Sequence, residues 1–87
     1  MYYIYMARNK TNYLYVGMTD NPHRRLTEHN NGSGSIHTKS GRFSLVFIEE
    51  HQTLEKARQR EIQIKKWTRD KKEKLITRYK QGLPTRP

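Results

Sequence analysis

Hydrophobic and aromatic residues alternate along two short stretches near the start of the chain. Residues 2–7 and 13–18 are rich in tyrosine and in aliphatic residues, and the polar segment 8–12 separates them. This pattern predicts a β-hairpin. Alternate side chains of a strand share a face, so a register that pairs the aliphatic residues places the tyrosines on the opposite face. The sequence therefore predicts that Tyr5 and Tyr15 meet there.

The residues after the hairpin predict a short helix. Asn21 is a favourable N-cap, and Pro22 suits the first helical turn. We expect the helix to run from Pro22 to about Asn30, where a glycine-rich segment ends it. Arg25 and His29 are four residues apart, so they lie one turn apart on the same face.

The middle of the chain predicts a polar loop followed by a third strand. Residues 31–42 are rich in glycine and serine and are long enough to suggest a functional loop. Residues 43–48 are apolar on both faces apart from Ser44, which favours a well-covered strand over an exposed edge. The loop residues with the right chemistry to contact phosphates are His37, Lys39 and Arg42.

Two basic helices are predicted in the C-terminal part. Thr53 is a suitable cap for a helix from Leu54 to Trp67, and a second helix follows from Asp70 to Tyr79. Glycine and proline then stop it, so we expect residues 1–81 to form one α+β domain and residues 82–87 to be a frayed tail.

Glu61 breaks the apolar pattern of the first of these helices. At about 100° per residue, it falls within the arc that Leu54, Ala57 and Ile64 define. An unpaired buried carboxylate costs several kcal/mol, so such a residue is normally neutralised, paired with a cation or bound to a metal. The alternatives are an ion pair with Lys65 or Arg58, or a rotated helix that leaves Glu61 in water.

Composition narrows the class of protein. The 87 residues suit one small domain, and the formal net charge of +10 favours a polyanionic partner. The absence of cysteine excludes disulfides and thiolate-bound metals. We find no apolar run long enough for a membrane span and no signal peptide, so we expect a soluble cytoplasmic protein. The candidate nucleic-acid contacts in the basic C-terminal third are Lys65, Lys66 and Arg69.

Five of these residues together match one kind of chemistry. A phenol can relay a proton, a guanidinium can bind phosphate, and a carboxylate is a hard ligand for Mg²⁺. These groups serve phosphodiester hydrolysis, and the candidates are Tyr5, Tyr15, Arg25, His29 and Glu61.

The ordered motifs resemble those of the GIY-YIG nuclease superfamily, and especially its small stand-alone bacterial members. Tyr3-Ile4-Tyr5 stands where the GIY triplet would, and Tyr15-Val16-Gly17 where YIG would. Residues 21–30 resemble the helix that carries the catalytic arginine, and residues 57–67 resemble the helix that carries the metal-binding glutamate. The resemblance implies a three-stranded antiparallel sheet flanked by helices.

The resemblance also implies a role for each candidate. Tyr5 and Tyr15 would shape or activate the nucleophile, Arg25 would hold the scissile phosphate, and His29 would assist proton transfer. Glu61 would bind a single Mg²⁺ or Mn²⁺. The leading hypothesis is thus an endonuclease whose substrate is DNA rather than RNA, with structured or damaged DNA as candidate forms.

Two departures from the family pattern keep other functions open. Tyr3 replaces the first glycine of GIY, and the late asparagine of the family is absent, since Asp70 and Glu73 stand at the comparable distance beyond Glu61. A non-catalytic nucleic-acid-binding module with the same fold is the main alternative. A structural or ribosome-associated basic protein is a third.

Overall fold

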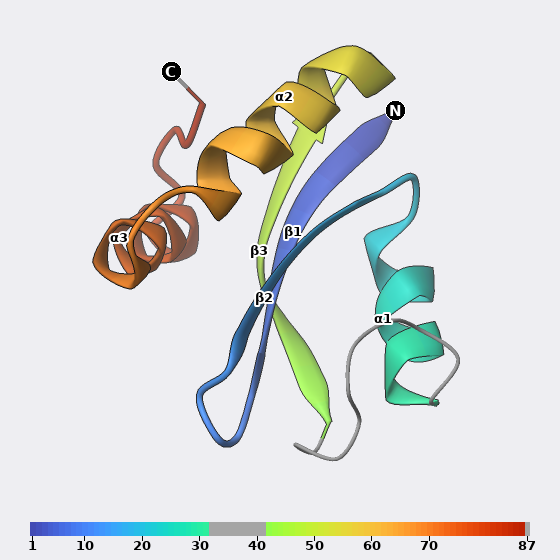
Figure 1. Cartoon of the computed structure of the whole chain (residues 1–87), viewed down its shortest axis with the longest axis vertical. Helices are drawn as coiled ribbons and strands as arrows, with labels where there is room; N and C mark the ends of the chain where they lie inside the picture. The colour runs from blue at the N-terminus through green and yellow to red at the C-terminus, as the bar shows by residue number, and fades with distance from the viewer. Residues whose placement is uncertain (32–41, 87) are drawn as a thin grey trace.

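The computed structural model describes residues 1–31 and 42–86 and contains each of the six elements that the sequence predicts (Figure 1). Most bounds agree to within a few residues, although the helix predicted to reach Trp67 ends at Lys65. The elements are β1 (Tyr2–Asn9), β2 (Leu14–Thr19), α1 (Pro22–Asn30), β3 (Phe43–His51), α2 (Leu54–Lys65) and α3 (Arg69–Lys80).

The strands form an antiparallel sheet in the order β2-β1-β3. This confirms the predicted three-stranded antiparallel sheet with flanking helices. The expectation that residues 43–48 avoid an edge is wrong, because β1 is central and β3 is an edge strand. The apolar pattern of β3 has another cause: α1 contacts β3 from one side of the sheet, and α3 contacts it from the other (Figure 1).

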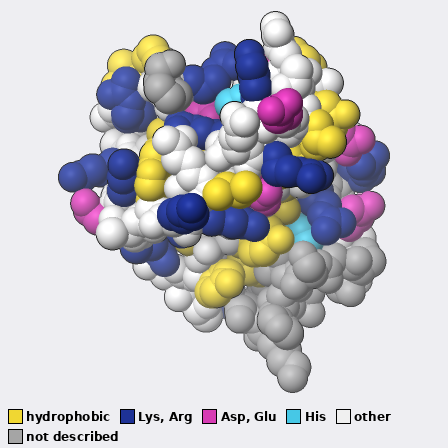
Figure 2. All heavy atoms as spheres, turned by 45° about the horizontal axis from the view of Figure 1, so that its top comes forward, with side chains coloured by type: hydrophobic (Ala, Val, Ile, Leu, Met, Phe, Trp, Pro, Cys, Tyr) yellow, Lys and Arg dark blue, Asp and Glu magenta, His cyan; other side chains and the backbone are white. Residues whose placement is uncertain are grey.

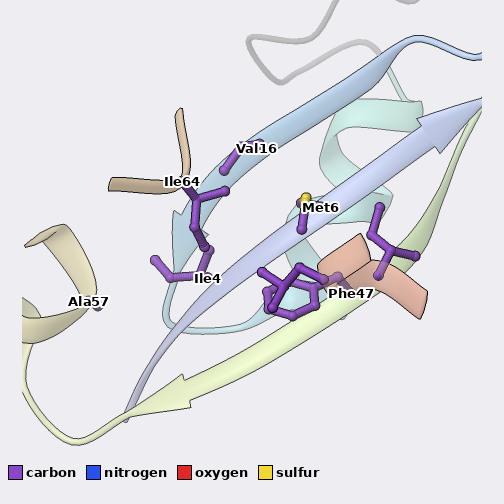
Figure 3. Close-up of a cluster of buried hydrophobic side chains, with 8 residues drawn as sticks. Ile4, Met6, Val16, Phe47, Ala57 and Ile64 are labelled. Atoms are coloured by element: carbon purple, nitrogen blue, oxygen red, sulfur yellow. The ribbon is translucent and has the colours of Figure 1, made fainter. Parts of the chain in front are cut away.

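One face of the sheet carries the main hydrophobic core. Ile4 lies opposite Met18, and Met6 lies opposite Val16, which confirms the predicted aliphatic register. Figure 3 shows Ile4 and Val16 beside Ile64 of α2. Helices α2 and α3 cover this face, and the buried cluster consists of Ile4, Met6, Val16, Phe47, Ala57, Ile64, Leu75 and Ile76.

The opposite face carries the tyrosines and packs against α1. Tyr5, Ala7 and Phe43 form a second buried cluster there, and Leu26 of α1 packs against it. Tyr15 is partly buried beside them. Since α1 lies across the sheet from α2 and α3 (Figure 1), this helix can bring its own polar side chains to the tyrosine face.

Local hydrogen bonds fix both ends of α1. The Asn21 side chain accepts a hydrogen bond from the Arg24 backbone amide, which confirms the predicted cap. At the other end, the Asn30 side chain donates to the Phe43 carbonyl (3.0 Å) and accepts from the Phe43 amide (2.8 Å). Asn30 thereby joins the end of α1 to the start of β3, next to His29.

A charged network joins α3 to the β1–β2 hairpin. Arg8 donates two hydrogen bonds of 2.7 Å to Glu73, and Arg69 donates to Glu73 and to the Asn12 carbonyl, each at 2.7 Å. Hydrogen bonds from Arg8 and then Arg69 lower the pKa of Glu73 to about 2.

The C-terminal segment, which the sequence predicts to be frayed, makes hydrogen bonds with the domain. Arg60 donates to the Thr85 carbonyl (2.8 Å), and the Thr85 hydroxyl donates to Glu49 (2.8 Å). Glu49 and Arg60 are themselves a buried ion pair with a 2.9 Å contact. Because buried charges require further polar partners, the backbone and hydroxyl of Thr85 complete this cluster.

Candidate active site

Tyr5 and Tyr15 lie together on the α1 side of the sheet. Tyr5 comes from β1 and is only 1% exposed, whereas Tyr15 comes from β2 and is partly buried. Their ring centroids are 6.1 Å apart. The predicted meeting of the two tyrosines is thus present in the structure.

Gly17 makes this arrangement sterically possible. It lies opposite Tyr5 in the β1–β2 pairing, and the Tyr5 ring extends across it. A Cβ atom at position 17 would lie 2.7 Å from the Tyr5 hydroxyl oxygen and 2.9 Å from Cε2 of Tyr15. The motif Tyr15-Val16-Gly17 does not by itself predict this steric role of Gly17. A glycine inside a strand does indicate that another group approaches the backbone closely, and that signal could have predicted it.

His29 from α1 completes the tyrosine cluster. Its Nε2 atom is hydrogen-bonded to the Tyr5 hydroxyl (3.2 Å), and its ring lies edge-on to Tyr15 with centroids 5.7 Å apart. Burial, and to a lesser extent the charge of Arg25, lowers the pKa of His29 below its ordinary value. The imidazole is therefore neutral near pH 7 and able to accept a proton.

The pKa of the Tyr5 hydroxyl responds to burial and to the charges of nearby residues. Burial is the largest effect and raises the pKa of Tyr5 well above its ordinary value, and Tyr15 raises it further. The guanidinium of Arg25 acts in the opposite direction, and the Glu61 carboxylate raises the pKa again. Charges from α1 and α2 thus act on this one phenol of β1, which remains protonated at neutral pH.

The Arg25 side chain forms an ion pair within the protein and is also partly exposed to solvent. Its side chain is 36% exposed, and Nη1 lies 3.3 Å from a carboxylate oxygen of Glu28. The neighbouring Arg24 is more exposed and pairs with Asp20 (2.6 Å) and, at 4.0 Å, with Glu28 as well. The position of Arg25 beside Tyr5 allows its guanidinium to bind a phosphate that reaches the phenol.

Glu61 is partly buried and ion-paired. Its side chain is 18% exposed, and Oε2 lies 3.2 Å from Nζ of Lys65. The predicted alternative of an ion pair with Lys65 is therefore present, and the charge of Glu61 also raises the pKa of Tyr5. Arg58, the other predicted ion-pair partner of Glu61, is exposed and forms no ion pair within the described residues.

The donor set around Glu61 suits one loosely coordinated divalent cation. Within residues 1–31 and 42–86, no group of three or more His, Asp or Glu side chains could enclose a metal. Mg²⁺ commonly binds one or two carboxylates and fills its other positions with water and substrate phosphate. A single Glu61 carboxylate beside a phosphate-binding arginine fits that mode.

The predicted nucleic-acid contacts have different environments. Lys65 is paired with Glu61, and Arg69 is held by Glu73 and Asn12. Lys66 and Arg42 are exposed. His37 and Lys39 lie outside the described residues.

The two acidic residues near the expected place of the late asparagine take part in other contacts. Asp70 pairs with Lys74 (3.2 Å) on the exposed side of α3, and Glu73 joins Arg8 to Arg69. Both carboxylates thus contribute to local structure.

Among the helices of the described ranges, none is long and apolar enough to cross a bilayer.

The chain is similar to known proteins in both sequence and fold. A family model for the GIY-YIG catalytic domain matches residues 1–74. A UPF0213 protein of Clostridium perfringens is 40% identical over 78 residues, which cover 88% of this chain and 84% of the relative. The UPF0213 protein YazA of Bacillus subtilis is 40% identical over 76 residues, which cover 86% of this chain and 77% of the relative. The solution NMR structure of the UPF0213 protein BH0048 from Bacillus halodurans is similar with a TM-score of 0.58 and 33% identity, covering 88% of this chain and 84% of that one.

Proposed function

The chain belongs to the GIY-YIG family, and we propose that it is a divalent-metal-dependent endonuclease that hydrolyses phosphodiester bonds of DNA. One observation carries this proposal: the Tyr5 hydroxyl is hydrogen-bonded to a neutral His29 and is close enough to Arg25 and Glu61 to interact with their charges. In this proposal, His29 is the proton acceptor, Arg25 the phosphate ligand and Glu61 the cation ligand, and all three act on one phenol.

The protonation states favour a proton relay over a phenolate base. Because the pKa of Tyr5 is raised, its phenol keeps its proton, while His29 has a lowered pKa and is neutral. In the proposed step, the Tyr5 oxygen accepts a proton from the attacking water as its own proton passes to Nε2 of His29. The 3.2 Å contact between Tyr5 and His29 supports this path.

Arg25 and Glu61 have separate roles at the phosphate. The guanidinium of Arg25 binds non-bridging oxygens, where negative charge accumulates during the reaction. Glu61 would hold a single Mg²⁺ or Mn²⁺, which when bound would neutralise charge on the phosphate and the leaving oxygen. Tyr15 packs beside Tyr5 and His29 and keeps both groups in place.

The charge of the protein supports a nucleic acid as its substrate. The net charge is +10, and Figure 2 shows Lys and Arg side chains spread over one face with fewer acidic side chains among them. Such a surface attracts a phosphate backbone without reading its sequence. We propose DNA, structured or damaged, as the substrate, which the protein would meet in the cytoplasm.

Cleavage by matched variants tests this proposal. Labelled duplex, single-stranded, branched and flapped DNA, together with RNA, would be incubated with Mn²⁺ or EDTA. We expect products only with Mn²⁺, and we expect Glu61→Gln to lose at least about a hundredfold in rate. Glu55→Gln on the exposed first turn of α2 removes the same charge and should cleave normally.

The same experiment distinguishes the alternative function. The family's late asparagine is absent, so a binding module that has lost its chemistry is the competing account. It predicts tight, salt-dependent binding and no products from any variant. Equal cleavage by wild type and Glu61→Gln would contradict the proposed site.

A further inference from the structure

Lys65 and Glu61 form an ion pair whose two members differ in burial. The Lys65 side chain is 51% exposed, whereas that of Glu61 is 18% exposed. They are one turn apart on α2, with the glutamate nearer the N-terminus, which is the favourable order for such a pair. The carboxylate is therefore the more buried member of the pair, and the ammonium lies at the end of a long side chain that reaches solvent.

The position of this pair makes Lys65 a competitor for the proposed cation. Glu61 is the carboxylate that acts on the Tyr5 hydroxyl, and its Oε2 atom already has a positive partner 3.2 Å away. A divalent cation on the same oxygen would repel the ammonium strongly at this range. The ammonium would have to move away, and its long exposed side chain permits that movement.

We infer that Lys65 is an exchangeable counter-ion: it neutralises Glu61 in the free protein, is displaced when a divalent cation binds, and then contacts a phosphate of the nucleic acid. This inference rests on the proposed function, because it assumes that Glu61 is the cation ligand. It assigns to Lys65 two alternative anionic partners, the carboxylate and the phosphate backbone.

The chain offers a closely matched control for this exchange. Lys66 is the next residue, is exposed and forms no ion pair within the described residues. It follows the last residue of α2 and is rotated by about 140° from Glu61 around the helix. Lys65→Met and Lys66→Met therefore remove the same charge, but only the first removes the partner of Glu61.

The first test measures Mn²⁺ affinity by titration calorimetry without nucleic acid. Removing the competing ammonium should make Lys65→Met bind Mn²⁺ about three- to tenfold more tightly than Lys66→Met. Equal affinities of these two variants would overturn the inference. Glu61→Gln is measured in parallel, and if it bound Mn²⁺ as well as wild type, the proposed cation site itself would be wrong.

The second test measures how the affinity for a short DNA duplex depends on salt. The Tyr5→Phe background keeps the duplex intact, and Lys65→Met is compared with Lys65 in that background. With Mn²⁺, the slope of log affinity against log salt should be shallower by about one for Lys65→Met, because one phosphate contact is lost. Without Mn²⁺ the slopes should agree, since Lys65 is then held by Glu61. The same slope difference in both conditions would contradict the exchange.

Discussion

Tyr5 and Gly17 are partners across β1 and β2, and the Tyr5 ring fills the space that a side chain at position 17 would need. A Cβ atom there would lie 2.7 Å from both Cζ and the hydroxyl oxygen of Tyr5. The glycine thus allows a large phenol to approach the neighbouring strand closely. In this position the Tyr5 hydroxyl reaches His29 and comes under the influence of Glu61.

Replacing Gly17 with alanine should therefore disturb the site as well as the fold. We expect Gly17→Ala to lower the free energy of unfolding by about 1–3 kcal/mol, because the methyl group displaces two tyrosine rings. Cleavage should fall with it, even at temperatures where the variant is folded. Urea unfolding and cleavage assays measure the two effects.

Gly82 provides the control for this change. It has a φ of +74° at the end of α3 and open space around it. Gly82→Ala should lose about 1 kcal/mol through backbone strain and cleave normally. If Gly17→Ala were as active as Gly82→Ala, the position of the Tyr5 ring would not matter for the reaction.

Removing the Tyr5 hydroxyl tests the proton relay. Tyr5→Phe keeps the ring in the core and should reduce the cleavage rate by about 10²- to 10⁴-fold, which is the range for loss of a general acid or base. Tyr13→Phe removes an exposed hydroxyl and should have no effect. Full activity of Tyr5→Phe would exclude the relay.

The pH dependence of cleavage should report on His29. Burial and Arg25 place the pKa of this imidazole below 6.5, so the neutral form that accepts the proton persists as the pH falls through 6.5. The rate should then decline only at lower pH, where His29 becomes charged. Single-turnover rates between about pH 5 and 8 measure this. A rate that is already halved at pH 6.5 or above would contradict the assigned role.

The buried pair of Glu49 and Arg60 should dominate the stability of the C-terminal half. Burial raises the pKa of Glu49, but hydrogen bonds from Arg60, Thr85 and His51 outweigh it and lower the pKa below its ordinary value. Glu49→Gln leaves the Arg60 charge buried without a counter-ion, so we expect a loss of about 3–5 kcal/mol in urea unfolding. The exposed Glu50→Gln should change stability little. A similar small effect for Glu49→Gln would show that the pair contributes little.

Much of the fold could be predicted because its signals are local. The alternation of aliphatic and aromatic residues gave the hairpin register, and that register alone brings Tyr5 to Tyr15. Asn21 and Thr53 marked helix starts through side-chain hydrogen bonds that span three residues. These patterns need no knowledge of distant parts of the chain.

The features that sequence reasoning missed depend on distant contacts. The edge position of β3 follows from strand order, which its own apolar pattern does not specify. Thr85 is 25 residues from Arg60, so no local pattern predicts their hydrogen bond, whereas the glycine and proline before it predict a frayed tail. Arg69 is a candidate phosphate contact in the sequence because basic residues bind phosphate. In the structure its guanidinium donates hydrogen bonds to Glu73 and to the Asn12 carbonyl of the hairpin, contacts that its local sequence does not predict.

The central claim is that Arg25 holds the phosphate beside Tyr5, and the neighbouring arginines allow a direct test. Arg25 acts on the Tyr5 hydroxyl, whereas Arg24 pairs with Asp20 at the surface. We would measure single-turnover cleavage of a DNA substrate with Mn²⁺ by Arg25→Ala and Arg24→Ala. The account predicts a loss of about a hundredfold or more for Arg25→Ala and at most a few-fold for Arg24→Ala. Equal rates for the two variants would contradict it.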